Sequence, residues 1–357
     1  MTDAAASAHP PEPETAADAR PPEPKAAADA RPTTTTAVSA HPPEPKIERS
    51  LTLHLRGDWG MANLHRVCGW ISQELTDRCG PYTKVAIWNS RGFSDAARAV
   101  GRGEVHVALT TPAAFTAAAL DGRGAFAGES FPELRALGTV PQRDRLVMGV
   151  HRSLGITSFA ELREAKPALT LATSVNDGEN YVGLAANALL ERSGVDVTGW
   201  GGSFLEDERP FESFDHVLTG RANAVIHEAV MLPHWQRFGG DMHFLEVEQD
   251  VLDGLRDDFS WPSAVIEEGY FPGCPRFQTL DFSDFLVLTR SDLPEDVAYA
   301  IAWVLGETRE LLERQYRHIP PERSPVTYPL DPVAMGRTPI PLHPGAARYY
   351  DALKETT

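Results

Sequence analysis

The adjacent residues His227 and Glu228 form the strongest candidate pair in this sequence for acid–base chemistry. A histidine that is oriented by a carboxylate can act as a general base near neutral pH. Neighbouring residues on a strand point to opposite faces, so these two side chains are poor partners for each other. If the chain is an enzyme, we expect His227 to be the base, with Asp177, Glu179 or Glu228 as the acid or the orienting group. His65 can contribute only if the fold brings it near.

The sequence shows none of the signatures that usually mark catalytic or cofactor sites. It has no Ser-His-Asp arrangement, no HExxH, and no Walker or Rossmann glycine motif. Its three cysteines, Cys68, Cys79 and Cys274, form no CxxC and no Cys/His set with metal-ligand spacing. We therefore predict no bound metal, no cofactor and free thiols, although Cys68 and Cys79 could pair if the fold places them together.

Composition indicates an acidic globular protein. Of the 357 residues, 42% are apolar and 23% are charged, and the formal net charge is −17 at pH 7. A nucleic-acid-binding protein needs a basic face, and an anionic membrane surface repels a negative protein, so we expect neither partner. No apolar run approaches the roughly 18–20 residues of a membrane helix, so direct membrane insertion is not expected either.

The first 47 residues differ from the rest of the chain. Pro-Pro-Glu-Pro occurs three times, at 10–13, 21–24 and 42–45, among alanines and charged residues. This segment lacks the large apolar side chains that would offset the entropy of ordering, so a disordered tether is predicted, with a ligand for a proline-binding module as the alternative. The opening residues lack a basic n-region and an apolar h-region, which predicts a cytoplasmic protein. A start farther upstream would permit a signal peptide and an extracytoplasmic location.

After the tether, polar loops follow the predicted strands and mostly lead into helices. Alternation of apolar and polar residues predicts a strand at 51–56, and further strands are predicted at 83–88, 105–109 and 169–172. Alternating strands and helices indicate an open parallel sheet that binds ligands at the carboxyl ends of its strands. The residues expected to contact a ligand there are Gly57, Asp58, Trp59, Gly60, Asn63, Asn89, Ser90, Arg91, Gly92, Phe93, Ser94, Thr110, Thr111, Ser174, Asn176, Tyr181 and His227.

Two of these loops bear on the charge of the ligand. The helix that follows Gly57 presents unpaired N–H groups and the positive end of its dipole, which suits an anion or a carboxylate. The backbone near Gly178 could form a similar nest for an anion. Asp177 and Glu179 flank that glycine and would repel an anion, so they could instead hold a cationic amine, or Asp177 could cap the helix. The sequence leaves both alternatives open.

A distinctive string stands near the C-terminus, Ile340-Pro341-Leu342-His343-Pro344-Gly345-Ala346-Ala347-Arg348-Tyr349-Tyr350. Its prolines favour a stiff extended segment, and a short helix is expected to begin at Gly345. This pattern predicts a C-terminal strap that packs on the globular part of the chain. The string also resembles the C-terminus of the TAXI-type solute receptors of TRAP transporters. The strand–loop–helix units are similar to that family's frame, with Asn63, Phe93 and Ala96 departing from its usual loop residues.

The resemblance implies an α/β fold of two lobes, the periplasmic-binding-protein-like type II class, with the ligand in the cleft between them. We place the tether at 1–47, the first lobe at 48–145 and the second lobe at 146–258. A return to the first lobe is then expected at 259–330, and a C-terminal strap on that lobe at 331–357.

The implied function is the binding of a small polar organic molecule, either an organic acid or an amino-acid-like molecule. A membrane transporter would be the partner if the protein is exported. The loop residues Trp59, Arg91 and Phe93 favour a ligand that is aromatic or carries an amide. A cytoplasmic enzyme that acts on a small metabolite is the alternative, because a fold does not fix a function.

Overall fold

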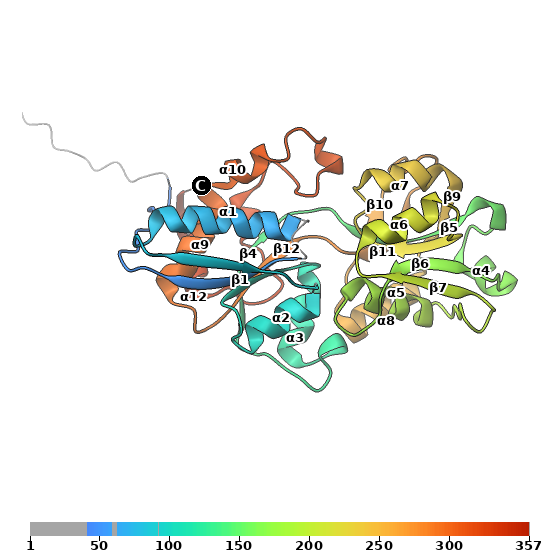
Figure 1. The fold of residues 1–357 in the computed structure, drawn as a ribbon, viewed down its shortest axis with the longest axis horizontal. Coiled ribbons are helices and arrows are strands. Elements are labelled where there is room, and N and C mark those ends of the chain that lie inside the picture. Colours follow the sequence, from blue (N-terminus) through green and yellow to red (C-terminus); the bar gives the residue numbers. More distant parts are fainter. Residues whose placement is uncertain (1–40, 59–62, 92, 357) are drawn as a thin grey trace, which may run out of the picture. The chain divides into compact units, whose positions relative to one another are not determined.

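Two β-sheets organise the part of the chain that the structure describes. The structure is a computed structural model that describes residues 41–58, 63–91 and 93–356. Figure 1 shows the two sheets as the centres of two α/β lobes, each with helices packed against its sheet. This architecture confirms the predicted two-lobed α/β fold.

The first lobe is built on a five-stranded sheet with the order β2-β1-β3-β12-β4. Its strands are β1 (Thr52–Arg56), β2 (Lys84–Trp88), β3 (Val107–Thr110), β4 (Leu134–Val140) and β12 (Phe285–Arg290). β1 runs parallel to β2 and β3, whereas β12 runs antiparallel to β3 and β4. The loops that follow β1, β2 and β3 therefore gather at one edge of the sheet.

Side chains alternate between the two faces of this sheet, and each face packs against a different set of helices. Val107 and Val287 belong to the core with α1 (Asn63–Arg78), α9 (Glu295–Glu307) and α12 (Pro344–Thr356). Ala108 and Leu288 face the other side, in the core that includes α2 (Phe93–Gly101) and α3 (Ala117–Asp121). The shorter helices α10 (Arg309–Arg314) and α11 (Pro332–Met335) complete the lobe.

The second lobe is built on the strand order β10-β11-β5-β8-β6-β7, with β9 paired to β5. Its strands are β5 (Arg145–His151), β6 (Thr170–Ser174), β7 (Ser203–Asp207), β8 (Ala224–His227), β9 (Met242–Phe244), β10 (Ser263–Ile266) and β11 (Phe277–Asp281). Its α-helices are α4 (Phe159–Ala165), α5 (Tyr181–Arg192), α6 (Pro210–Leu218), α7 (Pro233–Phe238) and α8 (Gln249–Phe259). β6 runs parallel to β7 and β8, so Ser174, Asp207 and His227 end neighbouring strands at one edge.

The chain crosses between the lobes twice, at 141–144 and at 282–284. The two crossing segments bond to each other: the N–H of Phe282 donates to the carbonyl of Asp144 at 3.0 Å, and the N–H of Gln142 donates to the Asp284 carboxylate at 3.1 Å. The return therefore begins near Phe282, and the expected return at 259–330 started too early. The segment 263–281 forms the antiparallel pair β10–β11 and pairs with β5, because its apolar side chains complete the second core.

The end of the expected tether is ordered. Ile47 forms a bridge with Cys79, and Pro42 is buried, so the body of the protein includes 41–47 of the segment assigned to the tether. The physical reason is that side chains of α9 satisfy the carbonyl groups of Pro42 and Pro43. The rest of the expected tether, residues 1–40, lies outside the described residues.

The C-terminal string docks on the first lobe, but its glycine has a different role from the one expected. Leu342 bridges to Ala136, and α12 begins at Pro344, so Gly345 already lies inside the helix. A Cβ at Gly345 would stand 2.1 Å from the carbonyl oxygen of Glu295. Glycine is therefore required because α12 approaches the start of α9 closely, and not because the chain turns there.

Three absences hold for the described residues. No helix there is both long and apolar enough to cross a membrane. No group of three or more His, Cys, Asp or Glu side chains in the same ranges is placed to hold a metal ion. Cys68, Cys79 and Cys274 are free cysteines, and burial raises the pKa of the Cys68 thiol, which makes it a poor nucleophile.

Candidate functional site

A cavity of about 310 Å³ lies between the two lobes. The crossing segment contributes Gln142 and Asp144 to its wall. The first lobe adds Asp58, Asn63, Leu64, Arg66, Thr111, Phe285, Gln315, Tyr316, His318, Ile319 and Pro325, and the second lobe adds Tyr181, Pro210, Phe211, Glu228, Ala229, Met231 and Leu232. Asp58, Asn63, Thr111 and Tyr181 are among the ligand contacts expected from the sequence, and Glu228 is among the expected acid–base residues.

Asp58 occupies the position where the sequence suggested an anion. β1 ends at Arg56, and Gly57 lets the first turn of α1 approach, since a Cβ there would stand 3.0 Å from the Cα of His65. The Asp58 carboxylate accepts the N–H groups of Leu64 at 3.0 Å and His65 at 3.4 Å. The protein's own carboxylate therefore uses these donors at the start of α1, which removes them from an anionic ligand.

Asp144 and Glu228 form a buried carboxylate pair at the centre of the site. Asp144 accepts the N–H groups of Ala229 at 3.0 Å, Val230 at 3.1 Å and Arg145 at 2.7 Å, so the backbone holds its negative charge. Glu228 hydrogen-bonds to Asp144, and burial together with the Asp144 charge raises the pKa of Glu228 well above its usual value. Burial also raises the pKa of Asp144, against the hydrogen bonds that it accepts. Since Asp144 accepts three backbone N–H groups, Glu228 is the member of the pair that more readily keeps a proton.

Two tyrosines and an amide line the same cavity. Burial raises the pKa of Tyr181 well above its usual value, and the charges of Glu228, Asp144 and Asp58 add to that shift. The hydroxyl of Tyr316 donates to the Asn63 amide oxygen at 2.9 Å, and Gln142 donates to the Thr111 hydroxyl at 3.0 Å. The tyrosine hydroxyls stay protonated, so that of Tyr181 can donate to a ligand, whereas that of Tyr316, which already donates to Asn63, can accept from one.

His227 lies beside this cavity and does not line it. Its Nδ1 accepts the N–H of Glu228 at 3.0 Å, so its Nε2 carries the hydrogen toward the Ser174 hydroxyl at 3.1 Å. Burial lowers the pKa of His227 to about 3, because the interior disfavours the imidazolium form. His227, Ser174, Arg91, Tyr181 and Glu228 share a small neighbouring cavity of about 10 Å³.

The other expected acid–base groups do not join His227. His65, Asp177 and Glu179 line neither of these two cavities. A neutral imidazole with so low a pKa holds an abstracted proton poorly, so the expected base is badly matched to neutral pH. The enzyme alternative therefore loses its proposed base, and Glu228 is the one expected acid–base residue that faces the larger cavity.

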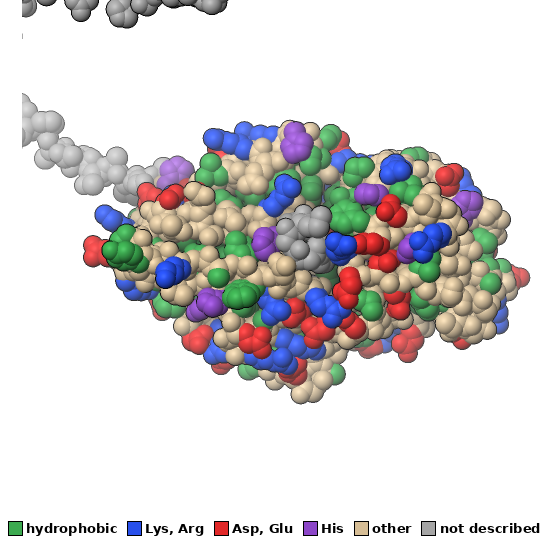
Figure 2. Space-filling model, in the orientation of Figure 1, with side chains coloured by type: hydrophobic (Ala, Val, Ile, Leu, Met, Phe, Trp, Pro, Cys, Tyr) green, Lys and Arg blue, Asp and Glu red, His purple; other side chains and the backbone are tan. Residues whose placement is uncertain are grey.

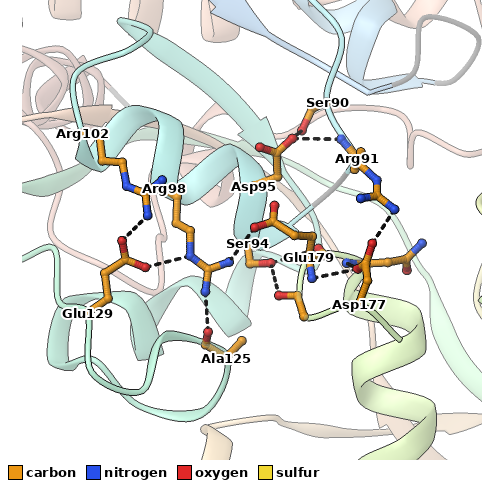
Figure 3. A network of polar contacts seen from close by, with 12 residues as sticks. Ser90, Arg91, Ser94, Asp95, Arg98, Arg102, Ala125, Glu129, Asp177 and Glu179 are labelled. Atoms are coloured by element: carbon orange, nitrogen blue, oxygen red, sulfur yellow. Dashed lines mark hydrogen bonds and ion pairs between the residues drawn. The ribbon is translucent and has the colours of Figure 1, made fainter. Parts of the chain in front are cut away.

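Two of the expected ligand contacts, Arg91 and Ser94, instead bond to the facing loops of the other lobe, which include the expected acid–base residues Asp177 and Glu179 (Figure 3). We call this set the interlobe latch: Arg91, Ser94 and Arg98 of the first lobe with Asp177, Gly178, Glu179 and Glu208 of the second. Arg91 pairs with Asp177 and Glu208, and Arg98 pairs with Glu179 at 3.2 Å. The Ser94 hydroxyl donates to the carbonyls of Gly178 at 3.1 Å and Glu179 at 2.9 Å.

The latch decides between the two alternatives left open at Asp177. Its carboxylate accepts the N–H groups of Glu179 and Asn180, both at 3.0 Å, and pairs with Arg91. Asn180, rather than Asp177, caps α5, because its side chain accepts the N–H of Val182 at 3.1 Å. Asp177 thus closes the turn before the helix and pairs with a cation of the protein itself, Arg91, so of the two alternatives the helix cap at Asp177 is not what the structure has.

The remaining expected contacts are scattered. Ser90 donates to Asp95 at 3.1 Å, Asn89 and Asn176 are exposed, and Thr110 is buried in the sheet. Trp59, Gly60 and Gly92 lie outside the described residues, as does the side chain of Phe93. Figure 2 shows acidic and basic side chains intermixed over the face that it draws.

Sequence reasoning missed the wall supplied by the crossing segments and the C-terminal part of the first lobe. Gln142 and Asp144 belong to a short polar stretch, Pro141-Gln142-Arg143-Asp144, between two apolar strands. That stretch could have been recognised as a crossing segment whose polar groups face the cleft. Nothing local to Gln315 or Tyr316 indicates that they reach it.

The fold and site define a two-lobed α/β protein with a small-molecule cavity where its lobes meet. The chain belongs to the NMT1-like family, because a sequence model of that family matches residues 66–352. Comparison of the sequence with curated proteins finds no significant match.

Solved structures with a similar fold include three bacterial proteins. XAC2383 from Xanthomonas citri bound to ATP is 12% identical, with a TM-score of 0.47 over 86% of this chain and 98% of that chain. Rpa4515 from R. palustris with adipate is 16% identical, with a TM-score of 0.47 over 86% and 97%. A TctC solute binding protein from Polaromonas is 14% identical, with a TM-score of 0.44 over 85% and 98%. At such identities we draw no conclusion about the ligand of this chain from theirs.

Proposed function

We propose that the protein reversibly binds a small amino-acid-like molecule in the cavity between its lobes, in the manner of a TAXI-type solute receptor. The observation that carries this proposal is the set of three buried carboxylates, Asp58, Asp144 and Glu228, in the wall of one interlobe cavity. Within the described residues of that wall, the basic side chains are Arg66 and His318, and both are exposed. The family relation supports the binding of a small molecule.

The charges of the wall favour an ammonium group over a second carboxylate. A buried carboxylate is costly without a partner, and Glu228 avoids that cost by keeping its proton. An ammonium group placed against Asp144 and Glu228 would supply the missing positive charge and three N–H donors. An organic acid without an amine would add negative charge to the same region, so the amino-acid-like alternative is favoured over the plain organic acid.

The rest of the wall limits the shape of the ligand. Leu64, Met231, Leu232 and Phe285 supply apolar surface, which suits a hydrocarbon or aromatic portion. The exposed Arg66 can pair with a carboxylate of the ligand at the mouth of the cavity. Ligand binding would hold the lobes in the arrangement that the interlobe latch already stabilises.

Calorimetry with matched ligands tests this proposal. A native mass spectrum of the protein from its own host first identifies any co-purifying molecule. That molecule is then compared with its N-acetyl derivative and with the acid that lacks the amine. We expect the amine-bearing form to bind at least about tenfold more tightly, since one buried charge pair is at stake. Equal affinity of the three forms would overturn the charge assignment, and chemical conversion of the molecule on incubation would overturn the receptor.

A membrane transporter as partner belongs to the proposal only if the protein is exported. Cell fractionation with an antibody against the chain separates the two locations. Recovery outside the cytoplasmic membrane supports delivery of the ligand to a transporter. Recovery in the cytoplasm leaves reversible binding in place and removes the transporter.

A further inference from the structure

The third Pro-Pro-Glu-Pro copy lies against one face of α9. The indole N–H of Trp303 donates to the carbonyl of Pro42 at 3.1 Å, and the Tyr299 hydroxyl donates to the carbonyl of Pro43 at 2.9 Å. Tyr299 and Trp303 are four residues apart, so they stand one turn apart on the same helix face. Aromatic side chains that donate to the carbonyls of consecutive prolines are a recurrent way of recognising a polyproline segment.

Polar side-chain contacts flank the two prolines on either side. Glu44 pairs with Arg78 at 2.9 Å, and the Arg78 guanidinium lies 4.6 Å from the centre of the Trp303 ring. At the other end, His41 Nδ1 lies 3.3 Å from the Glu307 carboxylate. We call Arg78, Tyr299, Trp303 and Glu307 the peptide-binding face. It contacts a basic residue, two prolines and a glutamate, in that order.

Every copy in the chain carries the groups that this face contacts. The residues before the prolines are His9, Arg20 and His41, and the glutamates are Glu12, Glu23 and Glu44. The match is closer still for the first copy, since residues 7–13 and 39–45 share the heptapeptide Ser-Ala-His-Pro-Pro-Glu-Pro. The hydrogen bonds are made to carbonyl oxygens, so an identical segment can make the same set.

We propose that the peptide-binding face is a recognition site for a segment with a basic residue followed by Pro-Pro-Glu-Pro, and that the first copy, residues 7–13, exchanges with the third copy on it. The third copy has the advantage of attachment, because only Lys46 separates it from Ile47, whose N–H donates to the Arg78 carbonyl at 2.9 Å. Attachment raises its effective concentration over that of a copy arriving on a longer linker or from another chain. The first copy therefore binds when the third is released.

A labelled peptide tests the exchange on the full-length chain. The probe is fluorescein-labelled Ser-Ala-His-Pro-Pro-Glu-Pro, and the control peptide replaces its prolines with alanine and its glutamate with glutamine. We compare the unaltered chain with a variant carrying Pro42→Gly, Pro43→Gly and Glu44→Gln. The variant should bind the probe at least about tenfold more tightly by fluorescence anisotropy, because its own ligand no longer competes. Equal binding, or equal binding of the control peptide, would overturn the proposal.

Two substitutions on the face itself check that the probe binds there. Trp303→Phe keeps an aromatic ring and removes the donor, and Arg78→Gln removes the charge that pairs with glutamate. In the variant chain, each should weaken probe binding about three- to tenfold, the effect of one lost hydrogen bond or charge-assisted contact. If neither substitution changes the affinity for the probe, the probe binds elsewhere and the proposed site is contradicted.

The source of the incoming copy is distinguished by a second pair of measurements on the variant chain. If the first copy of a second chain binds, sedimentation velocity should show a dimer that grows with concentration. If the first copy of the same chain binds, the protein stays monomeric, and adding Pro10→Gly and Pro11→Gly should raise its affinity for the probe. A monomer whose probe affinity does not change with those two substitutions would show that the first copy does not bind.

The unaltered chain provides a test that does not depend on a variant that folds differently. A spin-labelled version of the heptapeptide at millimolar concentration should broaden the indole N–H resonance of Trp303 in a ¹⁵N-labelled sample. That resonance is assigned by its disappearance in the Trp303→Phe chain. An unbroadened Trp303 signal, with the control peptide as reference, would contradict the exchange.

Discussion

Two sets of carboxylates lie where the lobes meet, and their surroundings are opposite. In the interlobe latch, Asp177 and Glu179 are partly exposed, and each faces an arginine of the first lobe. In the cavity, Asp144 and Glu228 are buried and face each other. In the latch, carboxylates therefore join the lobes through arginines of the protein. In the cavity, no arginine pairs with the two carboxylates among the contacts described above, and they favour a positively charged group. The local partner, and not the residue type, therefore decides whether a carboxylate is structural or available to a ligand.

The largest expected difference between the two sets is in stability. Asp144→Ala leaves the buried N–H groups of Ala229 and Val230 without their acceptor, so we expect it to lower the free energy of unfolding by about 2–4 kcal/mol. Asp177→Ala removes a partly exposed ion pair and should cost about 1 kcal/mol or less. Urea unfolding of the two variants measures the difference. Equal decreases in the free energy of unfolding would show that the cavity pair contributes no more to stability than the latch.

The next difference is in ligand affinity. Glu228→Gln keeps a donor toward Asp144 but cannot lose a proton to become negatively charged, so an amine-bearing ligand should bind at least about tenfold more weakly. Glu179→Gln is the matched control in the latch and should change the affinity by less than about threefold. Titration calorimetry compares the two variants. A stronger effect at Glu179 than at Glu228 would reverse the assignment of the two sets.

The effect of pH should separate the two sets as well. The pKa of Glu228 is raised in the empty cavity, and an ammonium group beside it would lower that pKa. A ligand that prefers the ionised form binds more tightly as the pH rises toward the pKa of the empty protein, and it releases a proton on binding. Calorimetry in buffers of different ionisation enthalpy counts that proton, and Glu228→Gln should abolish its release. A proton taken up instead of released would contradict the sign of this linkage.

The smallest expected effect concerns the latch alone. Arg91→Gln removes the pairs with Asp177 and Glu208, both of which involve half-exposed side chains. We expect ligand release to become about two- to fivefold faster at low salt, because the closed arrangement loses some stability. The difference should shrink at about 1 M salt, where surface pairs are screened. Stopped-flow measurement of the ligand release rate of both chains at both salt concentrations tests this. A rate difference that is independent of salt would exclude an electrostatic latch.

Much of the fold could be predicted from the sequence because it is encoded locally. Alternation at 51–56 and the polar loop that follows it predict a strand and its carboxyl end, and the structure has β1 there. The end of the second lobe was misplaced because β10 and β11 are short: β10 pairs with β11, and β11 pairs with β5, more than a hundred residues earlier. Such pairing depends on distant partners that no local pattern reveals.

The candidate site was predictable only in part, for a related reason. The loops after β1 and β6 were expected to contact a ligand, and Asp58 and Tyr181 line the cavity. Arg91 and Ser94 have the same kind of sequence context, yet they bond to the facing loop of the other lobe. Loop composition shows that polar groups stand at a strand end, but it does not show whether they face a ligand or one another. Their role as ligand contacts stays a prediction.

The docked C-terminal string has a consequence for how this sequence can change over generations. The hydroxyl of Tyr349 occupies space 1.7 Å from where a Cβ at Gly306 would stand, and that of Tyr350 lies 2.2 Å from the corresponding position at Gly138. Each tyrosine thus fits because a side chain is missing on a different element. A substitution at either glycine would survive only with a compensating change at its tyrosine. We therefore expect the string and these distant glycines to change together when the sequence changes.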